Sequence, residues 1–345
     1  MAYDSTTYQN LYKNDDWKRR EHMAVRKTAG WYLWTHQLLE VTGIDAADFL
    51  DHIFPNNIAN LKVGRERYTT MLDDKGEIID DVVVFRVKED TFWISTLFIF
   101  YLTDWLDQHK EGYQVVYRNI TETQHMFAVQ GPKALEMVNA IVDKPVDDLK
   151  FFSFEKNTVN GEIVLVNRAG FTGEKYGYEI YIAAEKMGLL RGALEKVSPE
   201  FGAREVTDFQ IMAWTLPTEA GYYYMRDLRH CNPLEVGLDR GINWEKNFIG
   251  KEALLKVRES GPAREMVGFT TDAVNARINA RDHGDAGNPV ILRGEEIGRV
   301  YKYNYSYVQE KPVGYMLVKA GSVKEGDHVL IKGRYDAVIT QKSFL

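Results

Sequence analysis

The spacing of apolar residues changes several times along the chain, and each change marks a predicted helix or strand. Between residues 45 and 53, apolar side chains recur every three or four positions, which predicts a short amphipathic helix. The run at 31–41 is aromatic and apolar and predicts one strand. The other predicted elements are a charged helix at 12–28, strands at 67–72, 78–87, 91–96, 126–129, 162–167 and 178–182, and helices at 100–108, 132–142 and 184–197.

The order of these elements predicts an α+β fold. Residues 73–76 (DDKG) are a turn signal between two strands, because glycine adopts the positive φ that a tight hairpin needs. Hairpins mixed with helices favour two ferredoxin-like lobes over a doubly wound parallel sheet. From residue 264 onward, short strands separated by turn glycines predict a small C-terminal all-β, barrel-like domain. We therefore expect one domain of two α+β lobes at 1–258 and a second domain at 263–345.

One segment, residues 231–254 (CNPLEVGLDRGINWEKNFIGKEAL), is too patterned for an ordinary loop. Pro233 locks its own φ and disfavours a helical conformation at Asn232, so we expect an extended turn there. The alternation of Leu234, Val236 and Leu238 with polar residues and glycine predicts a short strand after it. A helix is expected to begin near Phe248.

Composition excludes several classes of protein. The chain has 345 residues, of which 45% are hydrophobic and 27% charged, as in a soluble globular protein of two or three domains. No apolar run approaches the ~18 residues of a membrane span, and no signal-peptide pattern opens the chain, so we expect a cytoplasmic protein. The net charge of -7 argues against a nucleic-acid partner. The single cysteine cannot form an internal disulfide, and no metal-ligand spacing is present.

Four segments in the same order resemble motifs of one family. They are residues 71–87 (MLDDKGEIIDDVVVFRV), 127–135 (FAVQGPKAL), 170–182 (GFTGEKYGYEIYI) and 231–254. With them the chain is similar to the folate-dependent aminomethyltransferases, the family of the glycine cleavage T-protein, from about residue 24 onward. The resemblance implies an enzyme that uses tetrahydrofolate as co-substrate in one-carbon transfer, with two folate-binding lobes and a C-terminal barrel.

The resemblance also assigns roles to particular residues. Asp81, the second of two adjacent aspartates, matches the family's catalytic aspartate beside the reactive pterin nitrogens. Neighbouring side chains of a strand point to opposite faces, so Asp80 is not expected in the same pocket and is interpreted as a solvated turn residue. Tyr68 and Phe171 match residues that border the folate. Glu179 matches the glutamate that accepts two parallel hydrogen bonds from the pterin edge.

The chain also departs from the family pattern. Residues 1–20 replace the family's opening stretch with polar and basic residues, and Ala213 and Pro217 stand where the resemblance places arginines. Which residue replaces that missing arginine is left open by the sequence.

A second departure is aromatic. Strand alternation places Tyr32, Trp34 and His36 on one face, and Tyr222, Tyr223 and Tyr224 add three further rings. Related aryl-methyl-ether demethylases need a pocket that stacks an aromatic substrate and protonates its leaving oxygen. We therefore expect substrate-binding roles for Tyr32, Trp34 and Tyr223, and a proton-donating, catalytic role for His36 or Tyr222.

Three functions remain. The first is a tetrahydrofolate-dependent methyltransferase that demethylates a small donor, such as an aromatic methoxy compound. The second is a T-protein of the glycine cleavage system, which takes an aminomethyl group from a lipoyl-carrier protein. The third is a non-enzymatic folate-binding protein, which the presence of both Asp81 and Glu179 disfavours.

Overall fold

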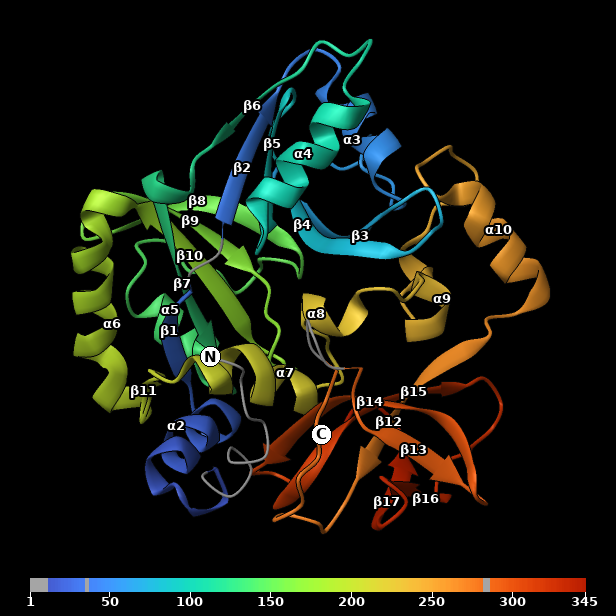
Figure 1. The fold of residues 1–345 in the computed structure, drawn as a ribbon. Helices are drawn as coiled ribbons and strands as arrows, with labels where there is room; N and C mark the ends of the chain where they lie inside the picture. The colour runs from blue at the N-terminus through green and yellow to red at the C-terminus, as the bar shows by residue number, and fades with distance from the viewer. Residues whose placement is uncertain (1–11, 35–36, 282–285) are drawn as a thin grey trace.

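The structure, a computed structural model, describes residues 12–34, 37–281 and 286–345. Two helix-covered sheets and a closed barrel surround the centre of the molecule (Figure 1). This arrangement confirms the predicted α+β class with two lobes followed by a C-terminal barrel. The domain limits at 258 and 263 stay a prediction.

The first lobe is a five-stranded antiparallel sheet in the order β3-β4-β5-β2-β6. Its elements are β2 (Gln37–Thr42), α3 (Ala46–Ile53), β3 (Glu66–Leu72), β4 (Ile78–Lys88), β5 (Thr91–Thr96), α4 (Ile99–His109) and β6 (Val116–Asn119). Val82 and Val84 of β4 pack in a buried core with Phe49 of α3 and Leu102 of α4. Because side chains alternate along a strand, Asp81, Val83 and Phe85 of β4 lie on the opposite face, toward the second lobe, and line the cavity there.

The second lobe is a six-stranded sheet in the order β11-β1-β7-β10-β9-β8, in which only the β1–β11 pair is parallel among the described residues. Its elements are α2 (Asp16–Lys27), β1 (Gly30–Trp34), β7 (Gln124–Gln130), α5 (Ala134–Asn139), β8 (Ser153–Val159), β9 (Glu162–Arg168), β10 (Gly177–Ala183), α6 (Met187–Phe201) and β11 (Arg204–Glu205). Pairing aligns Tyr32 with Ala128, Ala128 with Glu179, and Glu179 with Asn167. These residues therefore form one row across the sheet, on a single face.

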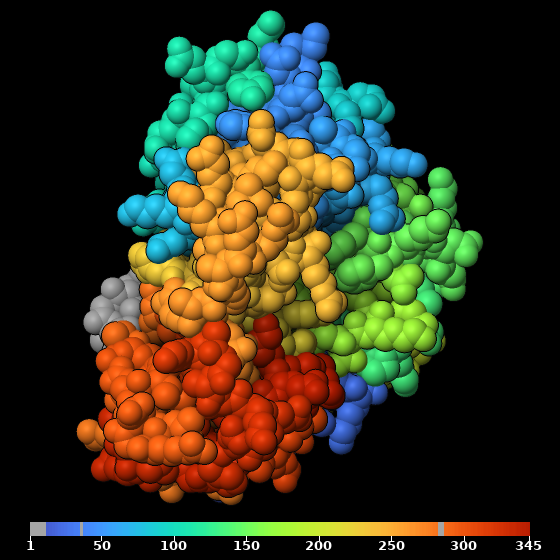
Figure 2. Space-filling model, turned by 90° about the vertical axis from the view of Figure 1, so that its right-hand side faces the viewer, coloured from blue at the N-terminus to red at the C-terminus, as the bar shows by residue number. Residues whose placement is uncertain are grey.

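A closed barrel ends the chain, with strands in the order β12-β15-β14-β13-β16-β17. They are β12 (Arg264–Thr270), β13 (Pro289–Leu292), β14 (Glu295–Ser306), β15 (Lys311–Lys319), β16 (His328–Ile331) and β17 (Tyr335–Thr340). Before the barrel come a π-helical turn (Ile211–Thr215), α7 (Leu216–Glu219), α8 (Met225–Leu228), α9 (Pro233–Val236) and α10 (Lys251–Ser260). Three short 3-10 turns complete the elements of the described residues: Thr121–Thr123, Ala184–Lys186 and Asp239–Gly241. In Figure 2, α10 (orange) lies on the molecular surface between the first lobe (blue) and the barrel (red).

A buried charged cluster ties the helix α2 to α7 and the barrel. Glu219 accepts hydrogen bonds from His22 at 2.9 Å, from Arg26 at 2.8 Å and from Ser306 at 2.6 Å. Burial opposes ionisation of this carboxyl, but His22 and Arg26 more than offset it and lower the pKa of Glu219 to about 2. A charged carboxylate is thus kept inside the protein because several donors surround it.

Two predicted strands were wrong in position or type. Residues 31–41 form two strands, since β1 belongs to the second lobe and β2 to the first. The strand expected after Pro233 is the short helix α9. Asn232 caps this helix by accepting from the backbone N–H groups of Leu234 and Glu235, and Glu235 bonds back to the Asn232 N–H. Proline at the first helical position and an asparagine cap are helix-start signals that the alternation of apolar residues concealed.

Candidate functional site

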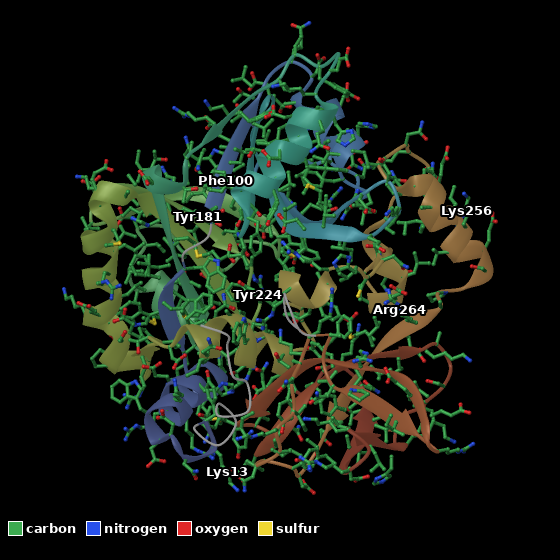
Figure 3. The ribbon with its side chains drawn as sticks, in the orientation of Figure 1. Lys13, Phe100, Tyr181, Tyr224, Lys256 and Arg264 are labelled. Atoms are coloured by element: carbon green, nitrogen blue, oxygen red, sulfur yellow. The ribbon has the colours of Figure 1, made fainter. Side chains whose placement is uncertain are left out.

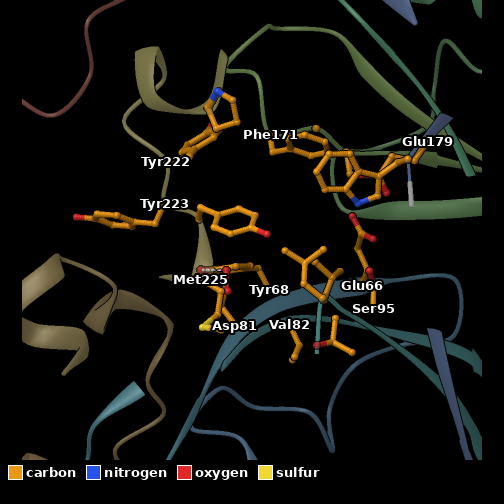
Figure 4. Close-up of a pocket in the computed structure, with 18 of the residues that line it drawn as sticks. Glu66, Tyr68, Asp81, Val82, Ser95, Phe171, Glu179, Tyr222, Tyr223 and Met225 are labelled. Atoms are coloured by element: carbon orange, nitrogen blue, oxygen red, sulfur yellow. Dashed lines mark hydrogen bonds between the residues drawn. The ribbon is translucent and has the colours of Figure 1, made fainter. Parts of the chain in front are cut away.

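One cavity of about 610 Å³ lies between the two lobes and the segment that precedes the barrel. Figure 4 shows the side chains around it, with Tyr68 and Asp81 from the first lobe and Phe171 and Glu179 from the second. In the whole molecule, Tyr181 and Tyr224 also lie near this centre (Figure 3). Asp81 lines the cavity, and so do six other predicted site residues: Tyr68, Phe171, Glu179, Trp34, Tyr222 and Tyr223.

Asp81 faces the cavity from β4. The Tyr68 hydroxyl on β3 donates a hydrogen bond of 2.9 Å to the Asp81 Oδ2 atom. Burial raises the pKa of Asp81 to about 6, even though this hydrogen bond favours the ionised form. A carboxyl with such a pKa can hold or release a proton near neutral pH, as general acid–base catalysis requires.

Asp80 lies on the other face of β4, as strand alternation predicts, but it is not the solvated turn residue that we expected. Its side chain is fully buried and accepts a hydrogen bond of 2.7 Å from the Thr96 hydroxyl. Burial and the neighbouring Asp81 raise the pKa of Asp80 to about 8. Its environment is therefore apolar enough to keep the carboxyl neutral at pH 7.

A buried ion pair lies close to Asp81. Lys302 of β14 donates to Asp227 of α8 at 2.5 Å, and the two side chains are 4% and 1% exposed. Asp227 raises the pKa of Asp81 and Lys302 lowers it, both after the larger effect of burial. The sequence analysis missed both residues, and Lys302, 75 positions from its partner, carries no local signal of this role.

Glu179 lines the cavity from β10, opposite Asp81 (Figure 4). The Asn167 side chain on β9 donates to its Oε2 atom at 3.0 Å, and the Tyr181 hydroxyl lies 3.4 Å from the same atom. Burial raises the pKa of Glu179 to about 7. Glu66 of β3 also lines the cavity, and the same Asn167 nitrogen donates to it at 2.8 Å. The sequence analysis missed Glu66, although strand alternation places it on the same face as Tyr68, two positions away.

An aromatic wall closes another side of the cavity. The Trp34 ring lies 4.8 Å from the Phe171 ring and stacks on Phe209 at 5.9 Å with an interplanar angle of 15°. Tyr32 is fully buried behind this wall, with its ring 6.2 Å from Trp34 and 6.1 Å from Phe171, and is not among the lining residues. Tyr222 is 44% exposed where it lines the cavity. His36, predicted as a proton donor, lies outside the described residues.

Lys342, close to the end of the chain, is the only lysine, arginine or histidine among the described lining residues. Its ammonium donates to the Tyr223 hydroxyl and to the Val236 carbonyl oxygen, at 2.6 Å each. Burial lowers the pKa of Lys342 to about 8. Ala213 and Pro217, at the positions where the family resemblance places arginines, line the same cavity. Lys342 therefore lies in the same cavity as the two positions where the resemblance places arginines.

Comparison with known proteins identifies the family. The model of the GCVT N-terminal domain matches residues 3–246. The chain belongs to this family. It is 32% identical over 341 residues to an aminomethyltransferase of Thermotoga maritima, covering 94% of the chain and 88% of the relative. It is 32% identical over 329 residues to an aminomethyltransferase of Bacillus pumilus, covering 92% and 86%.

The fold of this GCVT-family chain is also found in a solved structure. The crystal structure of the glycine cleavage system aminomethyltransferase T from Bartonella henselae matches with a TM-score of 0.80 over 94% of this chain and 88% of that one, at 24% identity. The family predicted from the sequence motifs is confirmed, and with it the predicted enzyme class, a tetrahydrofolate-dependent one-carbon transferase. Among the described residues, no helix is long and apolar enough to cross a membrane.

Proposed function

We propose that the chain transfers a methyl group from a small donor with an aromatic methoxy group to tetrahydrofolate. The observation that supports this function is the composition of one cavity, which combines the carboxyl groups of Asp81 and Glu179 with the aromatic wall of Trp34 and Phe171. Carboxyl groups suit the N–H donors of a pterin, and stacked rings suit an aromatic donor.

The residues around Glu179 fit a reduced folate. The cavity volume of about 610 Å³ is in the ordinary range for a small-molecule site. Glu66 lines the cavity, and two buried acceptors, Glu66 Oε1 and Asn167 Oδ1, have no hydrogen-bond partner among the described residues. The Glu66 carboxyl group can therefore accept an N–H group from a ligand in the cavity. Tetrahydrofolate, when bound, supplies the nitrogen that receives the one-carbon group.

Proton movement falls to Asp81 in this proposal. Because its pKa is about 6, Asp81 exists in both protonation states near neutral pH. It can take up a proton from the cavity or return one, while Tyr68 holds the carboxyl in position through its hydrogen bond of 2.9 Å. Tyr222 lines the exposed side of the cavity and is the candidate, among the described residues, for donating a proton to the oxygen that loses the methyl group.

A T-protein activity is the second candidate, because the curated relatives at about one-third identity are named aminomethyltransferases. Asp81, Tyr68 and Glu179 serve that reaction equally well. A lipoyl-carrier protein is a partner only under this reading. A folate-binding protein without catalysis is the third candidate.

The products of the reaction distinguish the three. The protein is incubated with tetrahydrofolate and, in separate reactions, with methoxyarenes, methylamines and an aminomethylated carrier protein. The proposal expects 5-methyltetrahydrofolate with a methoxyarene, and Asp81→Asn should abolish it. Formation of 5,10-methylenetetrahydrofolate with the carrier protein alone would replace the proposal with the T-protein reading. Folate binding without any product would support the non-catalytic reading.

A further inference from the structure

Three side chains join the two lobes at the wall of the cavity. Asn167 of β9 uses one nitrogen, Nδ2, to donate to Glu66 Oε2 at 2.8 Å and to Glu179 Oε2 at 3.0 Å. Glu66 comes from β3 of the first lobe, whereas Asn167 and Glu179 are paired residues of the second. An amide nitrogen has two hydrogens, so both are used in holding the two carboxyl groups together.

This cluster is short of donors. Glu66 is 3% exposed and Asn167 is fully buried, yet Glu66 Oε1 and Asn167 Oδ1 have no hydrogen-bond partner in the part of the chain that the structure describes. A buried acceptor without a donor is energetically unfavourable, so such atoms are rare unless a ligand or water bonds them. Burial and the adjacent Glu179 both raise the pKa of Glu66. A ligand rich in N–H groups would supply donors to the unpaired acceptors and would also favour the ionised form of Glu66.

We infer that Glu66 is a second ligand-binding carboxylate beside Glu179. It accepts the one N–H group of a bound 2-amino heterocycle that does not bond to Glu179. The inference rests on the proposed function and deepens it. The 2-amino-4-oxopyrimidine edge of a reduced pterin offers three N–H donors, one on the ring and two on the amino group. Glu179 has two oxygens and can accept two parallel donors. The remaining amino hydrogen points away from Glu179 and needs an acceptor, which Glu66 Oε1 supplies.

The position of Glu66 favours ligand binding over a purely structural role. As a link between lobes, Glu66 would be expected to pair with a cation or with several donors, as Glu219 does. Instead the one side chain that bonds it, within residues 12–34, 37–281 and 286–345, is an amide that also donates to Glu179. Glu66 lines the cavity, but its Oε1 atom is itself buried, so the carboxyl group has to turn for Oε1 to meet a ligand.

The test compares two ligands by titration calorimetry. The ligands are tetrahydrofolate and a folate analogue in which a methyl group replaces the 2-amino group. Glu66→Gln should weaken tetrahydrofolate binding by about 10-fold or more, because a charge-assisted hydrogen bond is lost. It should change binding of the 2-methyl analogue by no more than about twofold, since that ligand lacks the donor. The control is Glu155→Gln, which removes the same charge from an exposed position of β8 and should affect neither ligand.

The outcomes separate this inference from the proposed function. Equal weakening of both ligands by Glu66→Gln, or no effect on either, would overturn the ligand-binding role of Glu66. Should Glu66→Gln fail to fold, Glu66→Asp, which withdraws the carboxyl by one methylene, must show the same difference between ligands. If the unmodified protein does not bind tetrahydrofolate, the proposed function fails, and a free tetrahydropterin becomes the probe. Binding of that probe that depends on Glu66 would keep the inference, and no binding would end it as well.

Discussion

Replacing Asp81 with asparagine should make the protein inactive and, at alkaline pH, more stable. Burial raises the pKa of Asp81 from an ordinary 3.8 to about 6. Between these values the folded protein holds a proton that the unfolded chain has released, so the free energy of unfolding falls as the pH rises through this window. The difference of about two pH units corresponds to about 3 kcal/mol, and exposure of Asp81 to the cavity reduces this to about 1–3 kcal/mol.

Asparagine has the shape of the carboxyl but stays neutral. Asp81→Asn should therefore match the unmodified protein in stability at pH 4 and exceed it by about 1–3 kcal/mol at pH 8. Product formation should fall by about 10²–10⁴-fold because the acid–base group is gone. Urea denaturation at the two pH values measures the first effect, and the yield of methylated tetrahydrofolate measures the second.

Asp80→Asn is the matched control on the other face of the same strand. Burial raises the pKa of Asp80 to about 8. The stability of Asp80→Asn relative to the unmodified protein should therefore also increase as the pH rises from 4 toward 9. Turnover should fall by less than about 10-fold, since the Asp80 carboxyl bonds Thr96 and points away from the second lobe. The reasoning is refuted if both variants lose turnover equally, or if Asp81→Asn is less stable than the unmodified protein at pH 8.

Two further predictions concern the aromatic wall and the buried ion pair. Trp34→Ala should abolish the quenching of tryptophan emission by a methoxyarene ligand. Its loss of folding stability should be smaller than that of truncating a fully buried tryptophan, about 3–5 kcal/mol. The control Trp17→Ala, at an exposed position of α2, should leave the quenching unchanged. A large loss of melting temperature with no saturable quenching in the unmodified protein would argue for a structural Trp34. Lys302→Met should destabilise the protein by about 3–5 kcal/mol in urea, because Asp227 stays buried and loses its cation, keeping only the Tyr224 backbone N–H as a donor among the described residues. Adding Asp227→Asn to that variant should restore most of the loss, and a double variant as unstable as the single one would contradict this account.

Residues on regular strands were predictable from the sequence. The alternation of side chains separated Asp81 from Asp80, and the motif around Glu179 placed it on the strand that borders the cavity. The same rule could have identified Glu66 from its spacing to Tyr68. Strand alternation did not reveal that Asp80 is buried, because the far face of β4 is covered by helices from other parts of the chain.

Contacts between distant segments were not predictable. Glu66 and Asn167 are 101 positions apart, and Lys342 lies 119 positions from Tyr223. No local pattern encodes such a pair, since each partner is placed by a different lobe or by the barrel. Residues 31–41 show a related limit: both halves have strand composition, so apolar spacing cannot show that the chain passes from one sheet to another.

The central claim is that the cavity between the lobes binds reduced folate through Glu179. Calorimetric titration of the protein and of Glu179→Ala with tetrahydrofolate tests it most directly. The account predicts a saturable one-to-one complex that Glu179→Ala weakens by about 10-fold or more, because the ligand loses a charge-assisted acceptor. Unchanged affinity in a folded Glu179→Ala variant would contradict it and remove Glu179 from the folate site.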